Sequence, residues 1–181
     1  AKGAKQGGFI YSTGESKDKV GSGQSETKLT YEETMDDGSK VSQLRAYGSM
    51  TYAGFKSMIY ANLAGDDPRV AAAYNWIRAN YSLTENPGIG TDGMYYYYLT
   101  LARALEANRS RAASPNSAQV IVAIRSDGKT EERNYARDLV ERLGELQQAD
   151  GSFKSLGQRW MEGDPVLITS YALLALQTIR K

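Results

Sequence analysis

The apolar positions from Ala46 onward recur with the period of an α-helix, and two of the segments are apolar on one face only. Residues 68–81 follow Asp67, a candidate N-cap, and start with Pro68, which is favoured at the first helical position. Residues 135–147 carry leucines on one side and charged residues on the others. Both segments predict amphipathic helices with one solvated face.

Three other segments, residues 48–63, 92–107 and 165–179, are apolar around most of their circumference. Such helices are buried on several sides. The run from Tyr95 to Leu101, taken alone, also fits a strand. The strongly helix-forming residues that follow it favour a helix.

Because apolar and amphipathic segments alternate, the chain predicts helical hairpins arranged around a centre, with an inner layer enclosed by an outer one. The spacing between repeats is longer in one place, and residues 109–134 account for the extra length. There, two short runs flank Ser126-Asp127-Gly128, which predicts a small β-hairpin insertion near 119–133. A disordered insertion is the alternative. The fold class is therefore all-α, with this insertion.

The chain of 181 residues is long enough for a single domain, 1–181, with its own core. Residues 12–46 are rich in Ser, Gly, Thr, Lys, Asp and Glu and show almost no apolar periodicity. We interpret them as a long polar loop.

The amino-acid composition excludes several kinds of catalytic group and disfavours some partners. The chain has no Cys and no His, which removes thiol nucleophiles, imidazole bases and the usual zinc ligands, and we expect no metal and no cofactor. A net charge of +1 without a Lys/Arg run argues against nucleic acid as a partner. No apolar stretch approaches the roughly 20 residues needed for a membrane span.

A turn motif connects the sequence to a known family. Residues 147–153, QQADGSF, match the pattern QxxxGx(W/F), and a truncated copy occurs at residues 6–11, QGGFIY. With the tracts LRAYGSMTYAGFKSMIYANL, GMYYYYLTLARALEA and RWMEGDPVLITSYALLAL, the chain resembles prenyltransferase/squalene oxidase repeat proteins of the squalene-hopene cyclase and protein prenyltransferase superfamily. In that family the motif ends an outer helix, and its Gln and aromatic ring tie the turn to its neighbour.

The resemblance implies an α/α toroid with the fully apolar helices in the inner ring. Only about half of the hairpins of a complete toroid are present, so we expect the C-terminal half of a larger toroid. A missing N-terminal half, a second chain or a homo-oligomer would complete it. In an isolated monomer, the apolar segment 165–179 would leave a large patch exposed.

Catalytic residues are harder to assign. Triterpene cyclases of this type protonate an alkene with the Asp of a DxDD motif, which this chain lacks. The weak candidates for a buried acid are Glu162 and Asp164, and burial would have to raise the pKa of one of them. The alternative is a capping role at the helix that starts at Pro165. The family's zinc-dependent protein prenyltransferases are excluded as a function, because their metal site needs Cys and His.

Aromatic side chains are the candidates for ligand binding. They could line an apolar cleft with Tyr hydroxyls that orient a ligand, or simply pack between helices. Because Tyr95 to Tyr98 span one helical turn, at most two of them can face one cavity. The candidate binding residues are Tyr52, Phe55, Tyr95, Tyr98, Trp160 and Tyr171.

Together these observations favour a squalene-cyclase/prenyltransferase-like repeat domain that binds an extended apolar, isoprenoid-like ligand or a protein partner without a catalytic motif. One alternative is the C-terminal half of a terpene cyclase-type enzyme whose acid motif lies in an N-terminal part. Another is an assembly protein whose apolar inner helices form an oligomer interface. Relatives of this type often carry a secretion signal, which favours a secreted or periplasmic location.

Overall fold

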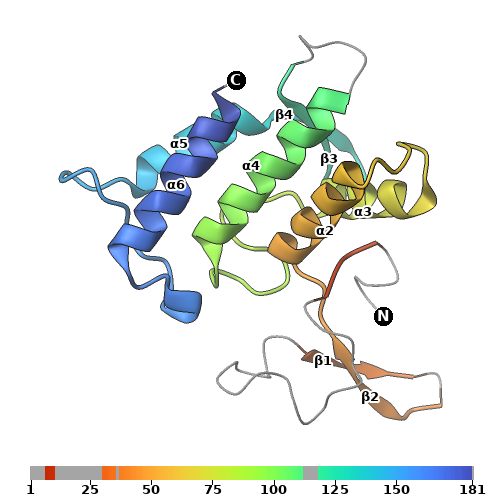
Figure 1. Cartoon of the computed structure of the whole chain (residues 1–181). Helices are drawn as coiled ribbons and strands as arrows, with labels where there is room; N and C mark the ends of the chain where they lie inside the picture. Colours follow the sequence, from red (N-terminus) through yellow and green to blue (C-terminus); the bar gives the residue numbers. More distant parts are fainter. Residues whose placement is uncertain (1–6, 11–29, 36, 112–117, 181) are drawn as a thin grey trace.

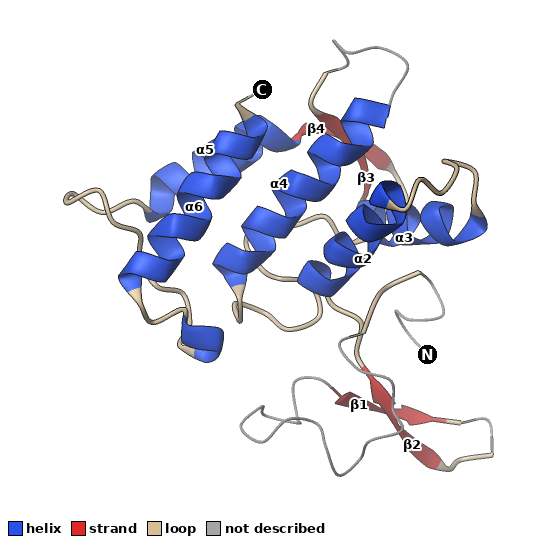
Figure 2. Ribbon diagram, viewed as in Figure 1, coloured by secondary structure: helices blue, strands red, loops and turns tan. Residues whose placement is uncertain are grey.

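The computed structural model describes residues 7–10, 30–35, 37–111 and 118–180, which form five α-helices and two β-hairpins (Figures 1 and 2). The helices are α2 (Gly48–Tyr60), α3 (Pro68–Ala79), α4 (Met94–Arg111), α5 (Tyr135–Leu146) and α6 (Pro165–Ile179). The strands are β1 (Thr30–Thr34), β2 (Lys40–Leu44), β3 (Val120–Ile124) and β4 (Thr130–Asn134). The helix-rich fold with a small inserted hairpin is confirmed.

Helices α2, α4 and α6 lie side by side as one layer, with α4 in the middle (Figure 1). These are the three segments that the sequence marks as apolar on most sides. The central helix α4 is buried along most of its length, including Tyr95, Tyr97 and Tyr98. Its charged residues, Arg103, Glu106, Arg109 and Arg111, all lie in its C-terminal half, and the buried Glu106 is paired with Arg109. The strand alternative for Tyr95 to Leu101 is wrong.

Helices α3 and α5 pack against this layer, α3 on α2 and α5 on α6 and α4. Helix α3 starts as predicted, because the Asp67 carboxylate accepts a hydrogen bond from the backbone N–H of Arg69 at 2.9 Å. Helix α5 buries Leu139 and Leu143 on its inner side, as its amphipathic pattern predicts. The apolar segments therefore form one layer and the amphipathic segments pack on it. The expectation that all three apolar helices are buried on several sides is wrong for α6, which lies at the edge of the layer and buries one side only.

The inserted hairpin pairs β3 with β4 in antiparallel register, with Ile121 opposite Arg133. Its turn is closed by Gly128, whose positive φ of 78° suits glycine. Ile121 is fully buried against the helices. The prediction of a hairpin near 119–133 is confirmed, and residues 112–117 of the approach lie outside the described part of the chain.

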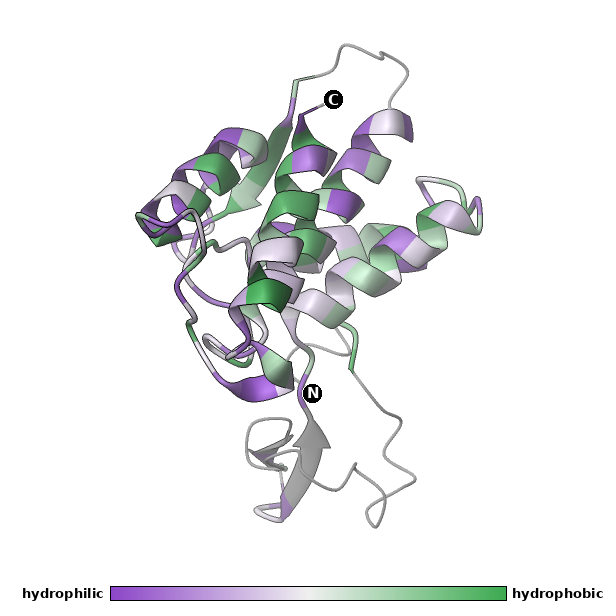
Figure 3. Ribbon diagram, turned by 60° about the vertical axis from the view of Figure 1, so that its left-hand side comes forward, coloured by the Kyte–Doolittle hydropathy of each residue, from purple (hydrophilic) through white to green (hydrophobic). Residues whose placement is uncertain are grey.

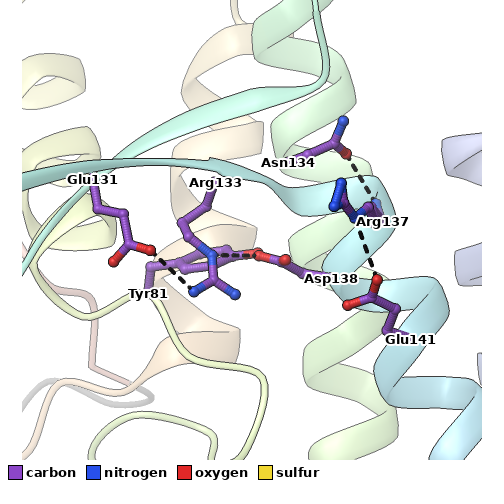
Figure 4. Close-up of polar contacts among 7 residues, drawn as sticks. All are labelled: Tyr81, Glu131, Arg133, Asn134, Arg137, Asp138 and Glu141. Atoms are coloured by element: carbon purple, nitrogen blue, oxygen red, sulfur yellow. Dashed lines mark hydrogen bonds and ion pairs between the residues drawn. The ribbon is translucent and has the colours of Figure 1, made fainter.

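A polar cluster attaches this hairpin to the helices (Figure 4). The Asp138 carboxylate of α5 accepts hydrogen bonds from the Tyr81 hydroxyl at 2.9 Å and from Arg133 Nε of β4 at 3.0 Å. Arg133 also pairs with Glu131 at 3.4 Å. Burial, followed by the neighbouring Asp138 carboxylate, raises the pKa of Tyr81. This cluster joins the segment after α3 to the continuous stretch of β4 and α5, and its groups satisfy one another.

The interpretation of residues 12–46 as one polar loop is wrong for its second half. Strands β1 and β2 form an antiparallel hairpin there, with Thr30 opposite Leu44 and Thr34 opposite Lys40 (Figure 2). The turn is stabilised by the Asp37 carboxylate, which accepts hydrogen bonds from the backbone N–H and the hydroxyl of Ser39. The hairpin lacks the alternation of apolar residues that normally reveals a strand. Residues 12–29 of the predicted loop lie outside the described residues.

The QxxxGx(W/F) turn ends α5. Gly151 takes a positive φ of 85°, and Gln147 pairs with Phe153 across the turn. The buried Phe153 ring meets Tyr95 of α4 edge-on, with centroids 6.1 Å apart. The aromatic residue thus ties the turn to α4, whereas the side chain of Gln147 hydrogen-bonds within the turn, to Gly151 O at 3.4 Å.

The truncated copy of the motif places its Phe in a comparable position. The Phe9 ring packs where Gly54 of α2 has no side chain, and a Cβ at Gly54 would come within 2.4 Å of it. The backbone N–H of Phe9 donates to the Thr51 hydroxyl at 3.0 Å. Both motif phenylalanines therefore contact the layer of α2, α4 and α6, one at α2 and one at α4.

Candidate functional site

The segment between the α5 turn and α6 crosses the N-terminal end of α4 and holds both acid candidates. Ser155 shapes it, because its hydroxyl lies 2.8 Å from the carbonyl oxygens of both Gly157 and Glu162. Trp160 and Met161 adopt positive φ angles of 53° and 65°. Left-handed backbone is costly for residues with large side chains, so other contacts must hold this segment in place.

Trp160 provides those contacts. Its ring stacks on Tyr47 at a centroid distance of 6.4 Å, and the Arg159 guanidinium lies 4.6 Å from the ring centroid. Gly93 allows this approach, because a Cβ there would come within 2.8 Å of two ring carbons. Trp160 is still 37% exposed and Met161 71% exposed. The segment therefore presents an apolar tip at the end of α4.

Glu162 is the buried acid of this segment, with only 1% of its surface exposed. Its Oε1 accepts a hydrogen bond from the backbone N–H of Tyr96 at 2.9 Å, so Glu162 caps α4. Burial raises the pKa of Glu162 to about 7, although backbone N–H groups at the start of α4 act in the opposite direction. Its Oε2 is buried without a hydrogen-bond partner among the described residues. Of the two acid candidates, Glu162 is thus the one whose pKa burial raises, while a catalytic role for it stays a prediction.

Asp164 has a different role. Its carboxylate accepts a hydrogen bond from the backbone N–H of Val166 at 2.8 Å, and the residue is exposed. It is the N-cap of α6, as the capping alternative predicts. That alternative is wrong for Glu162, which caps α4 instead of the helix that starts at Pro165.

A buried polar network continues from Glu162 to the start of α2. Arg159 Nη1 lies 3.5 Å from Asp92 Oδ2, and both side chains are largely buried. Asn86 is fully buried, and its Nδ2 donates to Ser49 Oγ at 2.9 Å and to the Asp92 carbonyl oxygen at 3.0 Å. Its Oδ1 accepts from the backbone N–H of Ser49. The network fastens the N-terminal ends of α2 and α4 together.

The aromatic candidates for ligand binding do not gather in a single cleft. Tyr52, Phe55, Tyr95 and Tyr98 are at most 1% exposed and belong to the core. The hydroxyls of Tyr95 and Tyr98 donate to the carbonyl oxygens of Lys154 and Leu83. Their packing matches the core alternative.

The two remaining candidates, Trp160 and Tyr171, have different ring partners, and Tyr171 packs against the edge of the core. Trp160 stacks on Tyr47 at the end of α4, and Tyr171 of α6 packs against Tyr96 with centroids 6.0 Å apart. Both are partly exposed. A ligand-binding role for these two residues stays a prediction.

A pocket elsewhere in the molecule was not anticipated from the sequence. A pocket of about 580 Å³ lies between α2, α4 and α6, near the C-terminal half of α4. It brings together cations from two helices, Lys56 and Arg103, with Tyr60 beside them. The signal in the sequence that could have revealed it is the presence of charged residues on helices that are otherwise apolar.

Within the described residues, no group of three or more carboxylates is placed to hold a metal ion. No helix of the described part of the chain has the length and apolar character needed to cross a bilayer. Comparison with known protein families, with curated proteins and with solved structures gave no match. The functional argument therefore depends on the geometry.

Proposed function

We propose that the protein is an assembly module, a helical repeat unit of the squalene-cyclase/prenyltransferase type that joins a second copy of itself through the outer flank of α6. In this proposal α2, α4 and α6 are inner helices of a partial α/α toroid, and α3 and α5 are outer helices. The observation that carries it is the uncovered apolar flank of the edge helix α6.

Helix α6 buries only one side. Its buried residues, Ile168, Ala172, Ala175 and Ile179, form a single stripe that faces the rest of the molecule. On the remainder of the helix, Val166 is 73% exposed, Leu173 57% and Leu174 39%. Figure 3 shows how strongly apolar residues predominate along α6. Exposed apolar groups clustered on one element are typical of an interaction surface.

The chemistry of α6 favours a second copy as the occupant. No charged residue occurs from Pro165 to Ile179. Two identical α6 flanks can therefore meet without bringing like charges together, as a two-fold symmetric contact requires. Each copy would bury the flank that the other leaves in water.

The toroid assignment is supported by two features of the arrangement. The three inner helices lie side by side in space in the order in which they occur along the chain. In the sequence, one outer helix separates each of them from the next. The two motif phenylalanines, Phe9 and Phe153, both contact this inner layer. An edge helix in such an array normally packs against the next hairpin.

The geometry gives less support to the other functions. An apolar ligand cannot reach the rings of Tyr52, Phe55, Tyr95 and Tyr98 in this conformation, because they are buried. The chain lacks the DxDD motif whose Asp protonates the alkene in triterpene cyclases, and Glu162 Oε1 is engaged with the backbone N–H of Tyr96 as the cap of α4. Catalysis is therefore not part of the proposal.

The test is native mass spectrometry combined with light scattering on the purified chain over a range of concentrations. We expect a species of twice the 19.9 kDa chain mass. Leu173→Glu should raise the dissociation constant by about tenfold or more, because it places a charge in an apolar interface. A 19.9 kDa monomer at all concentrations would overturn the proposal.

The matched control is Val140→Glu. Val140 is an isolated apolar residue on α5 that is 51% exposed, so the substitution adds the same charge to another helix surface. It should leave the dissociation constant unchanged. Equal effects of both substitutions would mean that net charge, and not the α6 flank, controls association.

A further inference from the structure

The pocket between α2, α4 and α6 has a charge distribution that the assembly proposal does not explain. Its volume is about 580 Å³, enough for a small organic ligand. Three helices contribute to its wall. The lining residues are Lys56, Tyr60, Arg103, Glu106, Ala107, Arg109, Ser110 and Thr178.

The one acid in the pocket wall is already fully used. Glu106 accepts hydrogen bonds from Arg109 at 2.7 and 3.0 Å, from the Gln119 amide at 2.6 Å and from the Tyr135 hydroxyl at 2.9 Å. It is 8% exposed. The Glu106 carboxylate therefore balances Arg109 and leaves the other two cations of the wall uncompensated.

Those two cations are Lys56 and Arg103. No ion pair joins either of them to an acid among the residues that the structure describes. Lys56 lies over the Tyr60 ring, 5.5 Å from its centroid. Burial, and then the positive charge of Arg103, lower the pKa of Lys56. The two cations thus share one pocket with excess positive charge.

Helix dipoles do not account for this charge. Cations stabilise a helix only within about its last turn. Arg109 satisfies that condition on α4, but α2 has no basic residue in its last turn, and Arg103 precedes the last turn of α4. Apart from the contact of Lys56 with the Tyr60 ring, neither cation has a role in its helix that the structure shows among the described residues.

We propose that this pocket binds the phosphate group of a small ligand, held between Lys56 and Arg103. A doubly charged anion matches the two uncompensated cations, and the planar fork of an arginine suits phosphate oxygens. The hydroxyls of Ser110 and Thr178 in the pocket wall donate to the backbone carbonyls of Glu106 and Leu174, so toward a ligand their oxygens are available only as acceptors. Hydroxyl groups attached to the phosphate would complement them.

The probe for the first test is inorganic pyrophosphate, added to the full chain and followed by titration calorimetry at low salt. Arg103→Gln and Lys56→Gln should each weaken binding by about tenfold, because each removes one charge-assisted contact. The matched control is Arg137→Gln, an exposed arginine on the outer helix α5. It should leave pyrophosphate binding unchanged.

A phosphate group can also belong to a lipid headgroup. Flotation with phosphatidylcholine vesicles, with and without phosphatidic acid, distinguishes this source from a free phosphate ester. Binding to phosphatidic acid vesicles alone, abolished in Arg103→Gln and retained in Arg137→Gln, would support the site and assign the phosphate to a lipid. Binding to neither probe, or equal loss in Arg103→Gln and Arg137→Gln, would overturn the proposal.

This inference is independent of the assembly proposal. Lys56 and Arg103 lie on α2 and α4, whereas association is tested at Leu173 on α6. Leu173→Glu should leave pyrophosphate binding unchanged, and Arg103→Gln should leave the dimer intact. Either proposal can therefore fail without affecting the other.

Discussion

Glu162 and Tyr96 lie 66 positions apart in the sequence, and the Glu162 carboxylate accepts a hydrogen bond from the backbone N–H of Tyr96 at 2.9 Å. This contact supplies from a distant segment the cap that α4 needs at its N-terminus. It also fixes the Trp160–Met161 turn against the start of α4. A carboxyl group in this buried position makes the fold sensitive to pH.

The first prediction concerns that sensitivity. The pKa of Glu162 is raised from 4.5 to about 7, so the folded state binds this proton more tightly than the unfolded state. The stabilising contribution of Glu162 is therefore complete below pH 4.5 and is lost as the pH rises to about 7. The loss is at most about 3 kcal/mol in the free energy of unfolding. Urea unfolding at a series of pH values measures it.

Glu162→Gln isolates this contribution. The amide keeps an oxygen that accepts from Tyr96 and cannot ionise. We expect the variant to lose the Glu162 part of the pH dependence and to be at least as stable as the wild type at pH 8. The control is Glu145→Gln at an exposed position of α5. An unchanged pH profile in Glu162→Gln would show that the carboxyl is not a source of the pH dependence.

The second prediction separates capping from acid chemistry at Asp164. Replacing an N-cap Asp by Ala costs about 1 kcal/mol, whereas Asn keeps the acceptor oxygen and costs little. Thermal unfolding of Asp164→Ala and Asp164→Asn should therefore give a reduced and a nearly unchanged midpoint. Equal destabilisation by both substitutions would mean that the charge of Asp164, and not its cap, is what α6 needs.

Local signals in the sequence were sufficient for most of the helical fold. The apolar period located α3 and α5 within a few residues, and Asp67 and Asp164 marked helix starts correctly because a cap is a contact within one turn. The Asp127-Gly128 turn identified the inserted hairpin for the same reason. Features that depend on residues close in sequence were therefore predictable.

Features that depend on long-range contacts were not. Strands β1 and β2 are stabilised by pairing with each other, and their polar composition hides them. The cap that Glu162 gives to α4 requires the fold to bring two segments together. From the run Tyr95 to Tyr98, the sequence predicts only that the four rings point in different directions. Three of them are buried and Tyr96 is 38% exposed because α4 lies in the middle of the layer.

The third prediction uses two neighbours in that run. The Tyr97 hydroxyl donates to the Ser82 carbonyl oxygen and the Tyr98 hydroxyl to that of Leu83, both at 2.8 Å. Removing either hydroxyl should cost about 1 kcal/mol, because a partly buried carbonyl loses its donor. Denaturant unfolding of Tyr97→Phe and Tyr98→Phe measures this. Tyr60→Phe is the control, since Tyr60 is 71% exposed and should be neutral.

The fourth prediction compares two glycines. Gly93 has a positive φ of 64°, and a Cβ there would come within 2.8 Å of the Trp160 ring, so Gly93→Ala should displace the ring and destabilise the fold. Gly144 lies inside α5, and a Cβ added there would meet no atom within 4 Å. Gly144→Ala should stabilise the protein by about 0.5–1 kcal/mol, because alanine is the better helix former.

Tryptophan fluorescence and thermal unfolding test both variants, Gly93→Ala and Gly144→Ala. In Gly93→Ala the emission should shift, because Trp160 loses its place between Tyr47 and the start of α4, and the midpoint should fall. In Gly144→Ala the emission should stay the same while the midpoint rises. A Gly93→Ala variant with wild-type emission and midpoint would contradict the close approach of Trp160 to Gly93, and with it the assignment of that ring as the contact that holds the strained turn.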